Sequence, residues 1–345
     1  MININWKIKS FIILFFFAFL IYLTIKPYIN FVNQELKISI IKTLFSKDSL
    51  KTYNNQVNIL LLGIAGENHD GPNLSDSINV INYNFKNNIL TTISIPRDIW
   101  SPTLKDKINS AYAYGEAKKP ESGGFILAKA EISEIVGMPI QYATVINFEQ
   151  FKELIDYLGG IDIKLEKSFI DKKFPIKGKE NDNCNGDPEY KCRYETIIFK
   201  KGPNHMNGET ALKFIRSRHA EGEEGTDFAR EKRQQKVIEA IKNKIIEKIK
   251  KFNIEKYKET YFIFNKLIKR DISNQQISII LKNILLNKNF QQKKIILDEA
   301  FFINPPLYEY NNLWVLIPKN NNYLNIHQYI QCNLKSEKNC EKLKK

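Results

Sequence analysis

The chain has few of the residues that usually build metal centres and nucleophilic catalytic sites. Its 345 residues include 4 histidines and 4 cysteines. No serine, histidine and aspartate, and no cysteine and histidine, stand at a recognisable catalytic spacing. These absences exclude a histidine-based metal centre and a nucleophilic triad as leading hypotheses. The histidines are scattered along the sequence, at His69, His205, His219 and His327.

Nucleic-acid-binding motifs and internal repeats are also missing. The formal net charge is +14, from 52 Lys+Arg against 38 Asp+Glu. Such a balance indicates an anionic partner: a nucleic acid, a membrane surface or a phosphorylated polymer. However, no helix–turn–helix, RNA-recognition or zinc-finger pattern accompanies the charge. Much of the excess is lysine spread through an Asn/Ile/Lys-rich sequence, which AT-biased coding produces without any function. We therefore expect no nucleic-acid partner.

The cysteines form two pairs with the same C-x7-C spacing, Cys184 with Cys192 and Cys332 with Cys340. Without histidines beside them, this spacing is not a zinc pattern. Two local disulfides in an oxidising compartment fit better, each stabilising the fold by about 2–3 kcal/mol. The alternative, four reduced thiols in a cytosolic protein, leaves the apolar N-terminus unexplained.

That N-terminus carries an unbroken apolar run, FIILFFFAFLIYLTI, at residues 11–25. With its flanks it approaches the roughly 20 residues that a membrane-spanning helix needs. It lacks a small-x-small cleavage site, which favours a retained signal-anchor over a cleaved signal peptide. Lysines lie on both sides, so the positive-inside rule decides little. Together with the expected disulfides, the run predicts a single-pass cell-membrane protein whose folded domain is extracytoplasmic. The anchor with a short cytoplasmic end occupies residues 1–29, and a polar linker occupies 30–56.

Beyond the linker, strand-like and helix-like segments alternate. Period-two or continuous apolar segments indicate strands, and apolar residues at helical spacing lie between them. This order predicts a three-layer α–β–α sandwich with a mixed central sheet. The expected strands are 57–63, 77–84, 89–96, 140–147 and 161–165, and the expected helices are 125–136, 148–160, 209–216 and 228–251.

The predicted catalytic domain covers residues 57–251, with a loop-rich insertion at 166–200 that holds the first cysteine pair. Residues 252–345 are predicted to form a C-terminal extension of helices and strands. Within it, Ser273 followed three residues later by Gln276 indicates a capping box at a helix start.

The stretch 214–235, FIRSRHAEGEEGTDFAREKRQQ, carries an unusual density of arginine. Arg216 and Arg218 precede a glycine-bearing loop, after which Asp227, Arg230 and Gln234 share one face of a predicted helix. Several guanidiniums beside one carboxylate suit a doubly charged phosphate, because each offers a planar fork for bidentate binding. Taken alone, the stretch is more simply a solvated, salt-bridged helix start.

Two aspartates lie at strand ends upstream. Asp76 stands in SDS at the start of the second predicted strand, and Asp98 follows Arg97 in IPRD at the end of the third. Because ligands in open α/β sheets lie where strand ends and loops converge, the two carboxylates can meet across neighbouring strands. Paired carboxylates with few other ligands suit Mg²⁺. Singly, each is more often a turn or cap residue.

In combination, these motifs resemble the LytR–CpsA–Psr family of cell-envelope proteins. The resemblance rests on SDS, ISIPRD, KINSAYAYG, NFEQFKELIDYLGGIDI, FKKGPNHMNGETALKFIRSRH and DFAREKRQQ, in family order over residues 57–250. The N-terminal anchor also matches the usual layout. The resemblance implies transfer of a glycopolymer from a polyprenyl-pyrophosphate carrier onto peptidoglycan, with a pyrophosphatase side activity. It also implies an α–β–α fold with a hydrophobic groove for the lipid.

The resemblance assigns roles to single residues as well. It implies that Asp76 and Asp98 hold Mg²⁺, with Mn²⁺ as the alternative metal, and that Asn109 of the KIN motif supports the site. Arginines would contact the pyrophosphate, and a carboxylate, Asp227 or Asp76, would take the proton of the attacking hydroxyl. The implied substrate-binding set is Arg97, Asn109, Arg216, Arg218, Arg230, Arg233 and Gln234, and the implied catalytic set is Asp76, Arg97, Asp98 and Asp227.

One departure from the family pattern affects the phosphate contacts. Many members carry an arginine directly before the Ser-Asp pair, where this chain has Leu74. His69 in the preceding loop is a candidate replacement, although a lone loop histidine is more often solvated. A second class of function stays open: a non-catalytic binder or regulator of polyprenyl-phosphate-linked or anionic envelope polymers.

Overall fold

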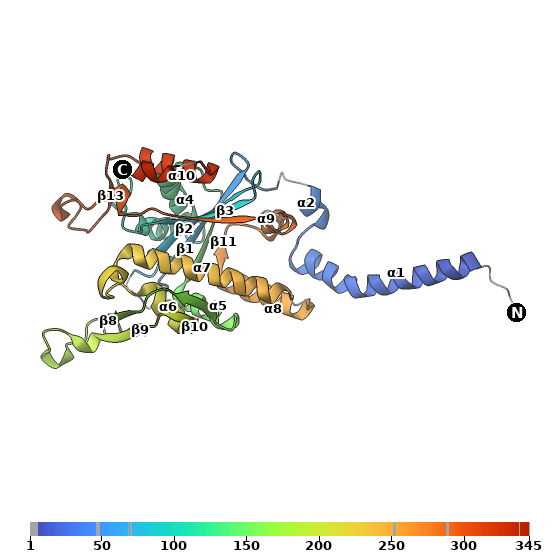
Figure 1. The fold of residues 1–345 in the computed structure, drawn as a ribbon, viewed down its shortest axis with the longest axis horizontal. Coiled ribbons are helices and arrows are strands. Elements are labelled where there is room, and N and C mark those ends of the chain that lie inside the picture. The colour runs from blue at the N-terminus through green and yellow to red at the C-terminus, as the bar shows by residue number, and fades with distance from the viewer. Residues whose placement is uncertain are drawn as a thin grey trace.

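The computed structural model describes residues 6–45, 49–67, 69, 71–250, 253–287, 290–337 and 339–344. A long helix, α1 (Trp6–Asn30), projects from the folded domain (Figure 1). Residues Ser10–Glu35 are long and apolar enough to cross a membrane. This confirms the expectation of one N-terminal apolar helix that fits a single span. The helix continues through a π-helical turn, Phe31–Glu35, and is followed by α2 (Ile40–Phe45).

The domain is built on a mixed sheet, as the alternation of strand and helix patterns predicts. Among the described residues, six strands form this sheet in the order β11-β6-β1-β2-β3-β12. The central pairs β1–β2 and β2–β3 are antiparallel, whereas β6 and β12 run parallel to their neighbours β1 and β3. The strands are β1 (Gln56–Ile64), β2 (Ser75–Asn84), β3 (Ile89–Ile95), β6 (Tyr142–Asn147), β11 (Lys269–Arg270) and β12 (Gln291–Ile296).

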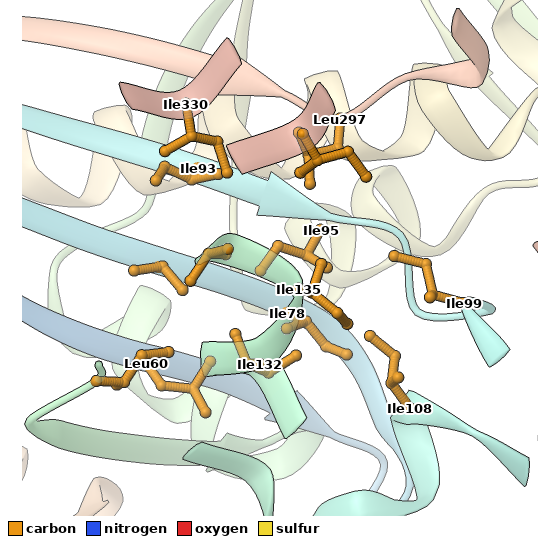
Figure 2. Packing of buried hydrophobic residues seen from close by; sticks show 14 of the residues in the cluster. Leu60, Ile78, Ile93, Ile95, Ile99, Ile108, Ile132, Ile135, Leu297 and Ile330 are labelled. Carbon is orange, nitrogen blue, oxygen red and sulfur yellow. The ribbon is translucent and has the colours of Figure 1, made fainter. Parts of the chain in front are cut away.

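One face of the sheet packs against α4 (Gly123–Val136) and α10 (Leu324–Lys335) (Figure 1). Alternate strand residues such as Leu60, Ile78 and Ile93 point into this layer, where Ile132 and Ile330 meet them (Figure 2). Burial of these branched side chains is the main stabilisation of the layer, at about 25 cal/mol per Å² of apolar surface.

The other face is covered by α7 (Asp227–Lys250) toward one end and α9 (Asn274–Leu286) toward the other. Beyond α7 lie α5 (Phe148–Tyr157) and α6 (Gly208–Arg216) (Figure 1). The three-layer α–β–α fold expected from the sequence is thereby confirmed. The predicted capping box is present at α9, where Ser273 and Gln276 bond reciprocally to each other's backbone N–H.

The C-terminal region contributes to the main sheet rather than following it as a separate unit. Strand β12 pairs with β3, and β11 pairs with β6, so both lateral strands come from residues beyond 251. Helix α8 (Ile254–Leu267) packs against α5. Two strands of the central sheet therefore lie beyond residue 251, where the predicted catalytic domain ends.

The insertion at 166–200 contains an antiparallel hairpin, β8 (Phe169–Pro175) with β9 (Tyr194–Phe199). The expected disulfide Cys184–Cys192 is present within the loop that joins the two strands, and Cys332–Cys340 links α10 to the 3-10 helix that follows it. The remaining elements are α3 (Ala111–Lys118), β4 (Trp100–Ser101), β5 (Asp106–Lys107), β7 (Ile161–Leu165), β10 (Gly202–Met206), β13 (Phe302–Ile303), β14 (Ile317–Pro318) and the 3-10 helices Ile108–Ser110, Cys184–Gly186, Lys191–Arg193, Gly222–Gly225, Glu299–Phe301, Leu307–Glu309 and Cys340–Lys344.

Candidate functional site

A cavity of about 220 Å³ lies where β1, β3 and β6 end and β2 begins. It is enclosed by the first turns of α5, the end of α6, the start of α7 and the end of β8, which places the insertion hairpin at its wall. Four arginines and one carboxylate line it within the described part of the chain. The lining residues are Gly63, Asp76, Ser77, Arg97, Ile146, Asn147, Phe148, Phe151, Phe174, Pro175, Ile215, Arg216, Arg218, His219, Arg230 and Gln234.

Arg97 lines the cavity, and its guanidinium lies near two carboxylates. Its guanidinium forms an ion pair with Asp76, which lines the cavity, and its Nε lies 3.5 Å from Oδ2 of Asp98. Asp98 is buried and also accepts a hydrogen bond from Lys107 Nζ at 2.8 Å. Asp76 and Asp98 are thus brought together by Arg97. Asp76 faces the cavity, whereas Asp98 lies behind Arg97 and holds it.

Arg216, at the end of α6, forms part of the cavity wall together with aromatic rings. Its guanidinium lies 4.7 Å from the ring centroid of Phe148 and 5.7 Å from that of Phe174. Burial lowers the pKa of Arg216, and the nearby charge of Asp76 works in the opposite direction. A guanidinium stays protonated in proteins, so this burial keeps a weakly hydrated positive charge facing the cavity.

One face of α7 completes the cavity, as the i, i+4 spacing of Arg230 and Gln234 predicts. Arg230 is buried at 5% exposure. Gln234 Oε1 accepts a hydrogen bond from Ser77 Oγ at 2.8 Å, which ties α7 to the start of β2. Asp227 begins this helix, but its side chain lies outside the described residues.

A chain of hydrogen bonds continues from this point into the sheet. Asn79 Nδ2 donates to Ser77 Oγ at 3.0 Å, and Ser94 Oγ donates to Asn79 Oδ1 at 2.7 Å. Gln235 of α7 donates to the same Ser94 Oγ at 2.8 Å. Because these groups are largely buried and have hydrogen-bond partners, the network fixes the position of α7 relative to β2 and β3.

Asp171 of β8 supports the loop 217–219 by hydrogen bonds. This loop carries Arg218 and His219 to the cavity. This aspartate is fully buried. Its Oδ2 accepts hydrogen bonds from Ser217 Oγ at 2.7 Å, from the Arg218 N–H at 3.2 Å and from the His219 N–H at 3.1 Å. A carboxylate is suited to this task because it offers several lone pairs to converging donors.

Arg233 belongs to the same helix as Arg230 but lies outside the lining of this cavity. Its guanidinium donates to the Phe214 carbonyl at 3.0 Å, to the Ser217 carbonyl at 2.6 Å and to Glu224 Oε2 at 2.9 Å. It therefore joins the end of α6 to the loop that follows. Burial lowers its pKa, with Glu224 acting in the opposite direction.

Two further candidates lie near the cavity without lining it. Asn109 is buried, and its N–H donates to the Arg97 carbonyl at 3.3 Å, so it contacts the backbone of the site arginine. His69 lies edge-on to Phe148, with ring centroids 5.5 Å apart. Burial, followed by the charges of Lys177 and Arg216, lowers the pKa of His69.

Sequence reasoning missed several residues of this site. Asn147 could have been found, because its position before FEQF marks a helix N-cap, and its side chain accepts from the Gln150 N–H in a capping box. Asp171 had no detectable signal: 46 residues separate it from Ser217, and it lies within the disulfide-bearing insertion. The apolar wall likewise gave no motif, since its members come from different elements: Ile146, Phe148, Phe151, Phe174 and Ile215.

The fold and the cavity define an α/β protein with an arginine-lined cavity that has aromatic rings in its wall. Residues 28–331 match the model of the LytR_cpsA_psr family, and the chain belongs to this family. A protein named polyisoprenyl-teichoic acid–peptidoglycan teichoic acid transferase TagU, from Bacillus mycoides, is 31% identical over 231 residues, 66% of this chain. The match spans 64% of the length of that relative.

Solved structures of the family share the fold. The crystal structure of B. subtilis TagV has a TM-score of 0.57 at 22% identity and covers 82% of this chain and 99% of that chain. A structure of YwtF (TagT), solved with bound octaprenyl pyrophosphate lipid, has a TM-score of 0.51 at 20% identity and covers 83% and 94% of the two chains. At these identities the structural likeness concerns the fold.

Proposed function

We propose that this chain transfers a glycopolymer from a polyprenyl-pyrophosphate carrier onto peptidoglycan or another cell-envelope acceptor. Membership of the family and the transferase name of the Bacillus mycoides relative support the proposal. We further propose that α1 anchors the chain in the cell membrane with the domain outside the cytoplasm. The paired cysteines support that orientation, because disulfides persist in oxidising compartments.

The observation that carries the proposal is the composition of the cavity. Arg97, Arg216, Arg218 and Arg230 place guanidiniums around a space that holds a single carboxylate among its described lining residues. The net positive charge suits a pyrophosphate, and the planar forks suit its paired oxygens. The aromatic and aliphatic wall beside Arg216 suits the first isoprene units of the carrier.

The reaction that fits this arrangement is an in-line phosphoryl transfer. The oxygen of an acceptor hydroxyl attacks the phosphorus that bears the glycopolymer, and the bond from that phosphorus to the polyprenyl phosphate breaks. Polyprenyl phosphate leaves with the bonding electrons. Arginines around both phosphates stabilise the negative charge that grows on the leaving group. Water in place of the hydroxyl gives the pyrophosphatase side reaction.

Within the described part of the cavity, Asp76 is the carboxylate placed to take the proton of the attacking hydroxyl. Its ion pair with Arg97 fixes the orientation of its carboxylate. Asp227 remains the other candidate, because it begins the same helix that presents Arg230 and Gln234.

We propose that a divalent metal would be held at this site by the carboxylates of Asp76 and Asp98, which lie on either side of Arg97. Mg²⁺ is usually held by one or two carboxylates together with substrate phosphates and water. Asp76 lines the cavity and is ion-paired with Arg97, whereas Asp98 is buried, accepts a hydrogen bond from Lys107 and has its Oδ2 at 3.5 Å from Arg97 Nε. When bound, the metal would neutralise part of the pyrophosphate charge.

The direct test is release of polyprenyl phosphate from a polyprenyl-pyrophosphate-linked glycan by the purified full chain, with peptidoglycan as acceptor and with or without Mg²⁺. Asp76→Ala should abolish transfer. Arg193→Ala is the control for removing a guanidinium outside the cavity, because this half-buried arginine lies in the disulfide loop, where it stacks on Tyr190 and donates to the Asp182 carbonyl. Tight binding of the donor without release of polyprenyl phosphate would instead support the non-catalytic binder.

A further inference from the structure

A surface beside the anchor helix carries apolar side chains that the domain leaves uncovered. It consists of the outer face of α2 and the C-terminal end of α9, and we call it the juxtamembrane patch. Phe45 is 82% exposed, Leu285 78%, and Ile41 and Leu286 72% each. Leu44 and Leu281 belong to the same patch. Clustered apolar residues of this size at a surface usually mark a contact with a partner or a membrane.

The two helices form one unit. The Ser39 N–H donates to Gln275 Oε1 at 2.8 Å, Thr43 and Ser278 share a hydrogen bond of 2.8 Å, and Lys282 Nζ donates to the Leu44 carbonyl at 3.2 Å. The polar residues of α2 therefore face α9. By the 100° helical step, Ile41, Leu44 and Phe45 lie on the side turned away from Thr43. Helices α2 and α9 run in the same direction, so their C-terminal ends, which carry exposed apolar side chains, lie together.

The patch is close to the end of the membrane-spanning segment. The apolar segment ends at Glu35, and α2 begins at Ile40. Five residues reach at most about 17 Å, even when fully extended. The junction is also fastened to the domain, because Asn274 Nδ2 donates to the Leu36 carbonyl at 2.9 Å and the ring of Phe31 packs edge-on against Tyr261. Figure 1 shows α1 leaving the domain beside α2 and α9.

The charges of the patch match a lipid surface rather than an acidic groove of another protein. Neither α2 (IIKTLF) nor α9 (NQQISIILKNILL) contains an aspartate or glutamate, and each contributes one lysine, Lys42 and Lys282. Short amphipathic helices with leucine and phenylalanine on one side and lysine beside them lie in the headgroup region of anionic bilayers.

We infer that the juxtamembrane patch docks onto the anionic lipid surface of the same bilayer that α1 crosses. The domain then has a second membrane contact besides its anchor, and its tilt relative to the bilayer is fixed. This contact is independent of the chemistry proposed for the arginine-lined cavity.

The test uses the full chain in vesicles of phosphatidylglycerol and phosphatidylcholine. All four native cysteines are paired, so a cysteine introduced at Leu285→Cys is the single thiol that a fluorophore can label. Tyr308→Cys is the control, because Tyr308 is equally exposed at 77% and lies in the 3-10 helix Leu307–Glu309, outside α2 and α9. Nitroxide-bearing lipids should quench the label at 285 several-fold more than the label at 308.

A second measurement separates lipid contact from protein contact and from local damage. Phe45→Cys places the label on α2, and adding Leu285→Glu with Leu286→Glu should then reduce its quenching by lipid. Equal lipid quenching at positions 45, 285 and 308 would overturn the inference. Protection of the label from aqueous iodide without quenching by lipid would also overturn it, because it would indicate a protein partner.

Discussion

Two arginines of α7 lie only three residues apart and have opposite tasks. Arg230 lines the cavity. Arg233 lies outside the cavity lining and donates hydrogen bonds to the carbonyls of Phe214 and Ser217. The same contrast holds for carboxylates, since Asp76 faces the cavity and Asp171 is fully buried beneath loop 217–219.

The comparison teaches that an arginine-rich motif can contain both the binding groups and the frame that holds them. Backbone partners distinguish the two. Arg233 and Asp171 satisfy backbone groups of the loop that carries Arg218, so their removal leaves buried polar groups without partners. The cavity arginines instead line the space between the strand ends, the end of α6 and the start of α7. Variants of the two groups should therefore separate activity from stability.

Among the variants that separate the cavity from its supporting residues, Arg216→Ala should have the largest effect, and that effect is on activity. Removing one guanidinium that stabilises the leaving phosphate should slow transfer by about 10²–10³-fold. The urea midpoint should stay near that of wild type, because the side chain contacts ring faces and makes none of the buried backbone bonds of Arg233. Rates of polyprenyl phosphate release and urea unfolding followed by circular dichroism check both parts. A large loss of stability would mean that Arg216, like Arg233, supports the fold.

Arg233→Met should act mainly on stability. The Phe214 and Ser217 carbonyls would lose their donor, and Glu224 would lose its ion pair. We expect the free energy of unfolding to fall by about 2–3 kcal/mol. Arg193→Ala removes a half-buried arginine with one hydrogen bond to a backbone carbonyl, so it should change this free energy by about 1 kcal/mol or less. Full stability with lost activity would mean that Arg233 binds substrate after all.

Asp171→Asn is expected to have a smaller effect with a distinct kinetic signature. The amide keeps the size of the side chain but lacks the charge that three donors share. We expect a loss of about 1–2 kcal/mol in stability. Because Asp171 positions Arg218 without reaching the cavity, kcat should fall while a Glu replacement partly restores it. Unchanged kcat in the Asn variant would contradict a positioning role.

The smallest effect concerns pH and His69. Its pKa is lowered in the folded state, chiefly by burial, so the unfolded chain binds the proton more tightly. Stability associated with the neutral ring is thus present above the unfolded pKa of about 6.5 and is lost as pH falls below it. His69→Gln should slightly reduce the loss of stability between pH 7 and pH 5, with no change in the pH profile at higher pH. An identical acid limb for both proteins would show that His69 contributes nothing.

The sequence predicted those parts of the fold and site that depend on local patterns. The strands around Leu60, Ile78 and Ile93 follow from continuous or alternating apolar residues, and Arg230 with Gln234 follows from helical spacing. Contacts between segments far apart in the chain could not be predicted from the sequence. Nothing local shows that β12 pairs with β3, because its segment QQKKII has a weak apolar pattern. The partner of loop 217–219 was hidden for the same reason, since Asp171 meets it only through the fold.

The most direct measurement of the central claim is an experimental structure of the chain with a short polyprenyl pyrophosphate bound. The account predicts that the pyrophosphate oxygens contact Arg97, Arg216 and Arg230, and that the first isoprene units lie against Phe148 and Phe174. Arg233 should keep its bonds to the Phe214 and Ser217 carbonyls. A pyrophosphate bound elsewhere, or one that draws Arg233 away from these carbonyls, would contradict it.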